Sequence, residues 1–135
     1  MVPTEAYRDE GTSYHYAPAS DYIEIKNHKI VSKFMEENKI PFIEGKTWST
    51  DAYFRETLRN FEQRKKDGCI SVEMECSAAQ AVCNFRNKEL FAFFTSGDLL
   101  DSPEWDERHK AGEIKGTQHD SDHFDIALEL ACYLS

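Results

Sequence analysis

Two hydrophobic periods alternate along the chain, and few folds are compatible with that alternation. Apolar residues recur at helical spacing over residues 27–38, whereas residues 69–74 alternate between apolar and polar side chains as in a strand. Helical spacing of small residues returns over residues 76–86, and residues 90–94 are an apolar run typical of a strand buried on both faces. Because strands alternate with helices, the pattern predicts an α/β protein. We expect a three-layer αβα fold, in which helices flank a mixed, mostly parallel sheet.

Three further segments complete the expected order of elements. Residues 46–54 are rich in side chains that favour strands, and a charged helix is expected from Glu56, with Gly68 at its C-terminal cap. A last helix is expected to begin near Asp120 or Ser121. Its core-facing residues would be Phe124, Ala127, Leu128 and Ala131.

The composition is that of one globular domain, which we expect to span residues 1–135. Apolar residues make up 40% of the chain, enough to bury a core. The formal net charge of −9 opposes contact with phosphate backbones and anionic lipids, so we expect neither nucleic acid nor a membrane as partner. No apolar run reaches the roughly 18 residues of a membrane span, and the first residues lack the basic and apolar regions of a secretory signal. A cytoplasmic location is therefore expected.

The spacing of cysteines and histidines gives little support to a metal or redox site. No two of the four cysteines have the spacing Cys-x-x-Cys. The absence of this spacing favours reduced thiols in packing roles over a redox pair or a zinc site. His119 and His123 are four residues apart, as on one face of a metal-binding helix. The acids between them favour a solvated first helical turn instead. We therefore expect no metal.

Two acids stand where the strand at residues 69–74 gives way to small residues, and they are the first candidates for a binding site. A period of two places Ser71, Glu73 and Glu75 on one face of the strand. Ligands of open α/β sheets bind beyond the carboxyl ends of the strands, and a carboxylate there can hold the adjacent hydroxyls of a ribose. Met74 would offer an apolar surface to a sugar or base. The alternative is that both acids are solvated carboxylates at a strand end or in a first helical turn.

Asp98 is a third acid that follows an apolar run, at residues 90–94. A carboxylate at this position can line a pocket, or it can begin a turn together with Gly97. The residues by themselves leave both interpretations open.

Four segments together resemble one family of enzymes. The run VEME at residues 72–75, before a small-residue helix, resembles the signature of the nucleoside phosphorylases. That family includes uridine phosphorylase, hexameric bacterial purine nucleoside phosphorylase and the related nucleosidases. Three other segments agree in order and spacing, namely residues 8–16 (RDEGTSYHY), 45–54 (GKTWSTDAYF) and 95–98 (TSGD). The resemblance covers the carboxyl-terminal part of family members only.

The resemblance implies roles for four residues of a sugar site. Glu75 would hold the ribose hydroxyls, Met74 would pack against the nucleoside, and Glu73 would help to shape the sugar site. Tyr53 falls where family members place an aromatic ring against the base or sugar. An ordinary core aromatic is the alternative interpretation of Tyr53.

The resemblance also implies a reaction, the reversible phosphorolysis of a nucleoside to free base and ribose 1-phosphate. Asp98 matches the acid that supports protonation of the leaving base in the purine enzymes, and Arg108 is the candidate to assist it. Nucleoside and phosphate would be the partners, with phosphate as co-substrate and no other cofactor. Features of purine and uridine enzymes are both present, so the base is left open.

The chain also departs from the family. Its six glycines form no Gly-x-Gly cluster, and the glycine-containing phosphate segments in the amino-terminal part of family members have no counterpart. A strand without its usual neighbours would favour self-association, so a homo-oligomer is expected. An alternative function follows, namely a catalytically inactive, truncated protein that binds nucleosides or serves as an assembly partner.

Overall fold

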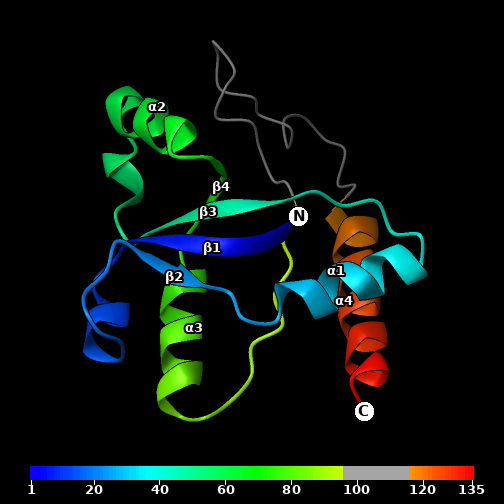
Figure 1. Cartoon of the computed structure of the whole chain (residues 1–135). Coiled ribbons are helices and arrows are strands. Elements are labelled where there is room, and N and C mark those ends of the chain that lie inside the picture. Colours follow the sequence, from blue (N-terminus) through cyan, green and yellow to red (C-terminus); the bar gives the residue numbers. More distant parts are fainter. Residues whose placement is uncertain (96–115) are drawn as a thin grey trace. The chain divides into compact units, whose positions relative to one another are not determined.

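The structure is a computed structural model that describes residues 1–95 and the helix from residue 116 to the C terminus, with the side chains of that helix from residue 123 onward (Figure 1). The chain forms two compact units, Met1–Phe93 and Phe94–Ser135. All strands of the described residues belong to the first unit. The expectation of one domain over residues 1–135 stays a prediction.

The sheet of the first unit has the strand order β2-β1-β3-β4. Its strands are β1 (Val2–Asp9), β2 (Tyr22–Glu24), β3 (Glu44–Thr50) and β4 (Cys69–Glu73). β1 pairs with β3, and β3 with β4, in parallel, while the short β2 pairs with β1 in the antiparallel sense. The expected mixed, mostly parallel sheet is therefore confirmed.

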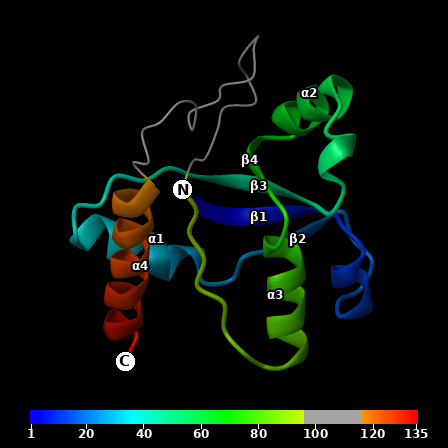
Figure 2. The ribbon, with the colours of Figure 1, turned by 180° about the vertical axis from the view of Figure 1, so that it is seen from behind.

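Helices lie on both sides of this sheet. The helices of the first unit are α1 (His28–Glu37), α2 (Leu58–Lys66) and α3 (Cys76–Phe85), with short 3-10 turns at η1 (Thr12–His15) and η2 (Tyr53–Arg55). Figures 1 and 2 show α1 and α3 on one side of the strands and α2 on the other. This arrangement confirms the expected αβα layering.

The two largest fully buried side chains come from β3 and α1. Trp48 of β3 is 2% exposed, and Phe34 of α1 is 1% exposed. The helical spacing over residues 27–38 is confirmed, because Val31, Phe34 and Met35 form the buried stripe of α1. Removing this apolar surface from water holds α1 against the sheet, which it contacts at β1.

The two ends of α2 differ in how well the sequence predicts them. The helix begins after Glu56, because Thr57 is its N-cap and accepts a hydrogen bond from the Asn60 amide at 3.4 Å. Its end agrees with the prediction, since Gly68 follows the C-cap Asp67 with a φ of +89°. Glycine adopts this left-handed conformation at little cost.

The expected strand over residues 90–94 is wrong. These residues form no strand in the described part of the chain, and they are half-buried instead of buried on both faces. A strand needs a hydrogen-bonded neighbour, and the four strands of the described sheet pair only with one another. An apolar run indicates burial, but it does not supply that neighbour.

β1 is a central strand that the hydrophobic pattern did not predict. Its segment VPTEAYRD contains Pro3 and Arg8, both of which are buried. Proline is unusual in a central strand, and arginine is rarely buried unless it has partners. Pro3 and Arg8 therefore interrupt the alternation of apolar and polar side chains that would indicate a strand.

The second unit contains α4 (Gly116–Tyr133), which begins before the expected start near Asp120. Serine and aspartate favour N-caps, but they are also tolerated inside helices. The core face expected for this helix stays a prediction.

None of the helices in the described part of the chain is long and apolar enough to cross a bilayer.

Candidate functional site

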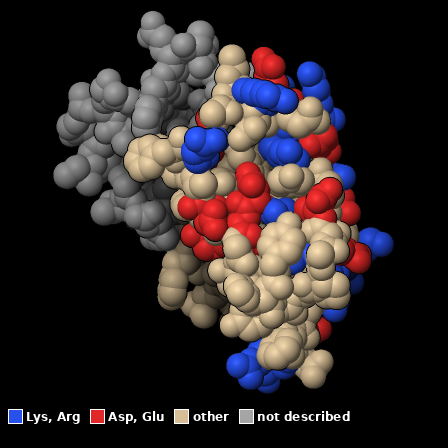
Figure 3. Space-filling model, turned by 90° about the vertical axis from the view of Figure 1, so that its left-hand side faces the viewer, with Lys and Arg blue, Asp and Glu red and all other residues tan. Residues whose placement is uncertain are grey.

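Three parallel strands end at the same edge of the sheet. The register pairs Asp9 of β1 with Thr50 of β3. It also pairs Ser49 with Glu73 of β4, so the carboxyl ends of β1, β3 and β4 lie beside one another. Figure 3 looks onto the side of the molecule where β1 and β3 end, and acidic side chains gather on this face. It is the edge at which α/β sheets bind ligands.

Glu73, the last residue of β4, uses both of its carboxylate oxygens inside the fold. Its Oε1 accepts hydrogen bonds from the hydroxyl of Ser49 and, at 3.3 Å, from that of Thr47. Its Oε2 accepts from the backbone amides of Glu75 at 2.7 Å and Cys76 at 2.6 Å. These amides lie at the start of α3, where N–H groups have no partner within the helix. Glu73 therefore joins β3 to α3.

Glu75 lies two residues further along, and its side chain is exposed. It is the N-cap residue of α3, but its side chain accepts no capping hydrogen bond. Its Oε2 accepts only a long hydrogen bond from the amide of Met74, at 3.3 Å, among the contacts of the described residues. The Glu75 carboxylate is thus at the surface and takes no part in the start of the helix.

The predicted alternation along β4 holds up to the end of the strand. Ser71 and Glu73 share a face, because the hydroxyl of Thr47 is bonded to both side chains. β4 ends at Glu73, so Glu75 lies in the turn before α3 and does not continue the alternation. The two acids therefore differ in direction as well as in partners.

Met74 and Tyr53 stand after the ends of neighbouring parallel strands. Met74 is 43% exposed in the turn between β4 and α3. Tyr53 is 46% exposed in η2, which follows β3, and its ring meets the Phe54 ring edge-on with centroids 5.3 Å apart. A core aromatic would be far more buried. Tyr53, Met74 and Glu75 can all be reached from solvent at this edge.

Asp98 and Arg108, the two candidate catalytic residues, lie outside the described residues. The side chain of His119, considered above as half of a metal pair, does so as well. The expected roles of these residues stay predictions. Within the part of the chain whose side chains are described, no three His, Cys, Asp or Glu residues are grouped as metal ligands.

A buried polar network beneath the edge was not predicted from the sequence. Glu10 is 7% exposed, and it accepts hydrogen bonds from the Ser77 hydroxyl at 2.7 Å and the Ser13 amide at 2.9 Å. Burial raises the pKa of Glu10, but the hydrogen bonds from Ser13 and Ser77 outweigh burial and leave this pKa below its ordinary value. Ser77 in turn donates its amide to the Ser49 hydroxyl at 3.0 Å. The network joins the end of β1 to α3 and β3.

Arg8 is directed into the fold and away from the surface. It is 4% exposed, and its guanidinium lies over the Tyr14 ring at 4.1 Å. Its Nε donates to the Ser13 hydroxyl at 2.8 Å, and its Nη1 donates to the carbonyl of Pro18 at 2.7 Å. Arg8 therefore orders the segment that follows β1, and its charge is not presented to a ligand at the edge.

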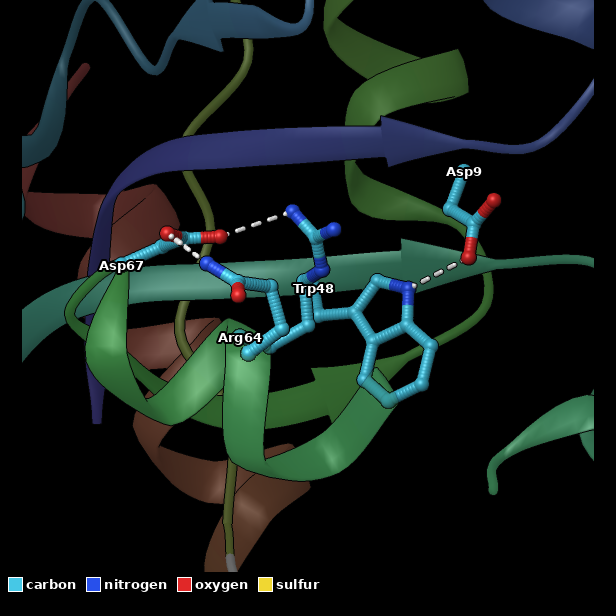
Figure 4. A network of polar contacts seen from close by, with 5 residues as sticks. Asp9, Trp48, Arg64 and Asp67 are labelled. Atoms are coloured by element: carbon cyan, nitrogen blue, oxygen red, sulfur yellow. Dashed lines mark hydrogen bonds and ion pairs between the residues drawn. The ribbon is translucent and has the colours of Figure 1, made fainter. Parts of the chain in front are cut away.

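A second set of polar contacts joins β1, β3 and α2 (Figure 4). Trp48 donates its indole N–H to Asp9 at 2.9 Å. Arg64 of α2 donates to Asp67 at 2.9 Å and lies over the Tyr7 ring at 3.6 Å. These contacts tie the end of β1 to β3 and attach α2 to the sheet.

Comparison with known proteins gives a family for this arrangement. The family model of the phosphorylase superfamily matches residues 1–130. The chain belongs to the phosphorylase superfamily. The match includes all four segments on which the resemblance was based, and it confirms that resemblance.

Two solved structures share the fold. The AMP nucleosidase from Bacteroides thetaiotaomicron VPI-5482 has a TM-score of 0.54 and 19% identity, over 67% of this chain and 41% of its own. The P knowlesi homologue of P falciparum PNP has a TM-score of 0.53 and 19% identity, over 64% of this chain and 37% of its own. The chain thus spans about two fifths of the length of these proteins. No curated protein matches the sequence.

Proposed function

We propose that the chain binds a nucleoside at the carboxyl edge of its sheet and takes part in the reversible phosphorolysis of that nucleoside. One observation carries the proposal. Glu73 satisfies the amides at the start of α3, so the exposed carboxylate of Glu75 is left available to a ligand. A carboxylate with two oxygens suits the adjacent hydroxyls of a ribose. Membership of the phosphorylase superfamily supports this choice of ligand.

Each residue of the proposed site has one task. Glu75 accepts hydrogen bonds from the two ribose hydroxyls. Met74 supplies an adaptable apolar contact to the nucleoside, and Tyr53 places its ring against the base or sugar. Glu73 shapes the site from inside the fold, through its bonds to β3 and α3.

In the proposed reaction, an oxygen of phosphate attacks the anomeric carbon of the ribose as the bond from that carbon to the base breaks. The base leaves with the electron pair of the broken bond, which is stabilised by a proton, and ribose 1-phosphate is formed. Asp98 supports protonation of the leaving base, and Arg108 assists Asp98. Phosphate is the co-substrate, and no metal or other cofactor takes part.

A second candidate function is that of a catalytically inactive protein that binds nucleosides or serves as an assembly partner. The sequence favours it, because its six glycines form no Gly-x-Gly cluster of the kind that cradles phosphate. Nucleoside binding at Glu75 is common to phosphorolysis and to an inactive nucleoside-binding protein, and only turnover separates these two.

The test measures nucleoside binding and phosphate-dependent release of base from uridine and inosine. Glu75→Gln should weaken nucleoside binding about tenfold or more, because hydrogen bonds to a charged acceptor are lost. Glu36→Gln is the matched control, since Glu36 is an exposed acid on α1. It should leave binding unchanged.

The outcomes of that experiment separate the two functions. Base release that requires phosphate supports phosphorolysis. Nucleoside binding without release, at any phosphate concentration, supports the inactive protein. Equal binding by wild type and Glu75→Gln contradicts the site itself.

The proposed setting is a homo-oligomer in the cytoplasm, with neither nucleic acid nor a membrane as partner. The net charge of −9 supports the exclusion of polyanions. Exposed apolar side chains in the first unit, with Phe54 at 94%, support self-association.

A further inference from the structure

We propose that Ser49 is a positioning residue for the carboxylate of Glu75, on which it acts through Glu73 and the first turn of α3. The inference rests on the proposed nucleoside site. Ser49 is fully buried in β3, with 0% of its surface exposed. A buried hydroxyl does not touch a ligand at the surface, so any effect of Ser49 on binding must pass through its neighbours.

The start of α3 is capped by the sheet and not by its own N-cap residue. The first N–H groups of a helix have no partner within it, and an N-cap side chain commonly accepts one of them. In α3 the N-cap residue is Glu75, whose side chain accepts none. Glu73 accepts from the amides of Glu75 and Cys76 instead. Ser49 accepts from the amide of Ser77 at 3.0 Å.

Ser49 is central to this capping because its hydroxyl both donates and accepts a hydrogen bond. It donates to Glu73 and accepts from the amide of Ser77, and a hydroxyl can do both at once. The hydroxyl of Ser77 is itself held by the buried Glu10 at 2.7 Å. Loss of the Ser49 hydroxyl therefore loosens Glu73 and leaves the buried amide of Ser77 without its acceptor.

Without the Ser49 hydroxyl, the first amides of α3 and the ribose hydroxyls of a ligand would compete for the carboxylate of Glu75. When Glu73 no longer holds the amides at the start of α3, the N-cap carboxylate of Glu75 is the acceptor closest in sequence. A carboxylate drawn into the cap cannot also accept hydrogen bonds from two ribose hydroxyls. Ser49 thus keeps Glu75 turned outward.

The experiment compares two ligands on the full chain, inosine and 2′,3′-dideoxyinosine, which lacks both hydroxyls. Ser49→Ala should weaken inosine binding about tenfold while changing dideoxyinosine binding less than about twofold. Ser49→Thr keeps a hydroxyl and should restore inosine binding. Ser32→Ala is the matched control, because Ser32 is a buried serine of α1 that donates to Glu44 at the start of β3.

Amide hydrogen exchange reports the cap separately from the ligand. Ser49→Ala should speed exchange at the amides of Cys76 and Ser77 about tenfold relative to the amides of α1. Glu73→Gln is a second variant for the case that Ser49→Ala fails to fold by circular dichroism. It removes the negative charge that caps α3, and it should weaken inosine binding more than dideoxyinosine binding.

Three results would overturn the inference. One is an equal loss of affinity for both ligands in Ser49→Ala, which would indicate general damage to the site. Another is faster exchange without any loss of inosine affinity, and the third is unchanged exchange. If the wild-type chain binds no nucleoside, the proposed function fails together with the ligand role of Ser49. The exchange measurement still decides in that case whether Ser49 caps α3.

Discussion

Glu73 and Glu75 are the same amino acid, separated by one residue, yet their oxygens meet different partners. Those of Glu73 accept from side chains of β3 and from amides of α3, whereas the side chain of Glu75 is exposed. The difference arises because β4 ends at Glu73 and the chain then turns into α3. Folding stability should therefore depend on the first acid, and direct contact with a ligand on the second.

Replacement of each acid by alanine should separate these tasks. Glu73→Ala should lower the free energy of unfolding by about 2–4 kcal/mol, because it leaves amides and hydroxyls of the fold without their acceptor. Glu75→Ala should change it by no more than about 0.5 kcal/mol, since an exposed side chain with no capping bond is lost. Urea unfolding monitored by circular dichroism measures both. Equal losses would contradict the division of tasks.

Glu10 should make stability depend on pH. Burial raises its pKa, but hydrogen bonds from Ser13 and Ser77 outweigh burial and hold the pKa below the ordinary value of 4.5. A depressed carboxyl pKa contributes stability that is present above the unfolded pKa and is lost as pH falls through the folded pKa. Glu10→Gln should therefore flatten the decline in stability on the acid side of pH 4.5. Urea unfolding at a series of pH values tests this, and an unchanged acid slope would argue against it.

At the scale of elements, the side chain of Ile70 in β4 packs against Gly45 of β3. A Cβ added to Gly45 would lie 2.7 Å from Cγ1 of Ile70, well inside the packing distance of two carbon atoms. Glycine at this position thus lets the Ile70 side chain lie against the backbone of β3. The contact belongs to two strands, so neither segment alone indicates it.

Gly45→Ala should destabilise the chain by about 1–3 kcal/mol, because the added methyl group displaces Ile70. Combining it with Ile70→Ala should cost less than the sum of the two single changes, since the clash is removed. Gly11→Ala is the control, as its Cβ would meet only Asp51 Oδ2 at 3.7 Å, an ordinary contact. Thermal unfolding of the four variants measures this coupling. Additive effects would contradict the close approach.

At the scale of the whole molecule, the first unit leaves large apolar side chains in contact with water. Phe54 is 94% exposed, Leu58 72% and Ile43 63%. Contiguous apolar surface on a monomer is limited in size, and larger patches mark interfaces. The proposed homo-oligomer would cover part of this surface.

The oligomer can be tested by the mass of the chain in solution. Light scattering coupled to size-exclusion chromatography should give a mass of at least twice 15.6 kDa, the mass of one chain. Dilution should lower this mass only if the subunits dissociate. Nucleoside at saturating concentration should leave this mass unchanged, because the proposed site is built from one chain. A mass of 15.6 kDa at every concentration would count against self-association.

Patterns within single segments of the sequence were sufficient to predict much of the fold and to indicate the family. α1, α3 and β4 follow from local periodicity, because the spacing of their apolar or small residues lies within one segment. Runs such as residues 72–75 and 45–54 also led to the family, and they contain Tyr53, Met74 and Glu75, which stand at one edge of the sheet. The strand expected at residues 90–94 was wrong, since a strand also requires a neighbour.

Only the folded chain shows which polar residues are buried and what they hold. Ser49 and Glu73 are 24 residues apart, and Glu10 and Ser77 are 67 apart, yet each pair shares a hydrogen bond. Hydrophobic periodicity compares residues that are close along the chain, so it does not reveal hydrogen bonds across such separations. The inward direction of Glu73, and with it the exposure of Glu75, therefore depends on contacts that form when β1, β3, β4 and α3 come together.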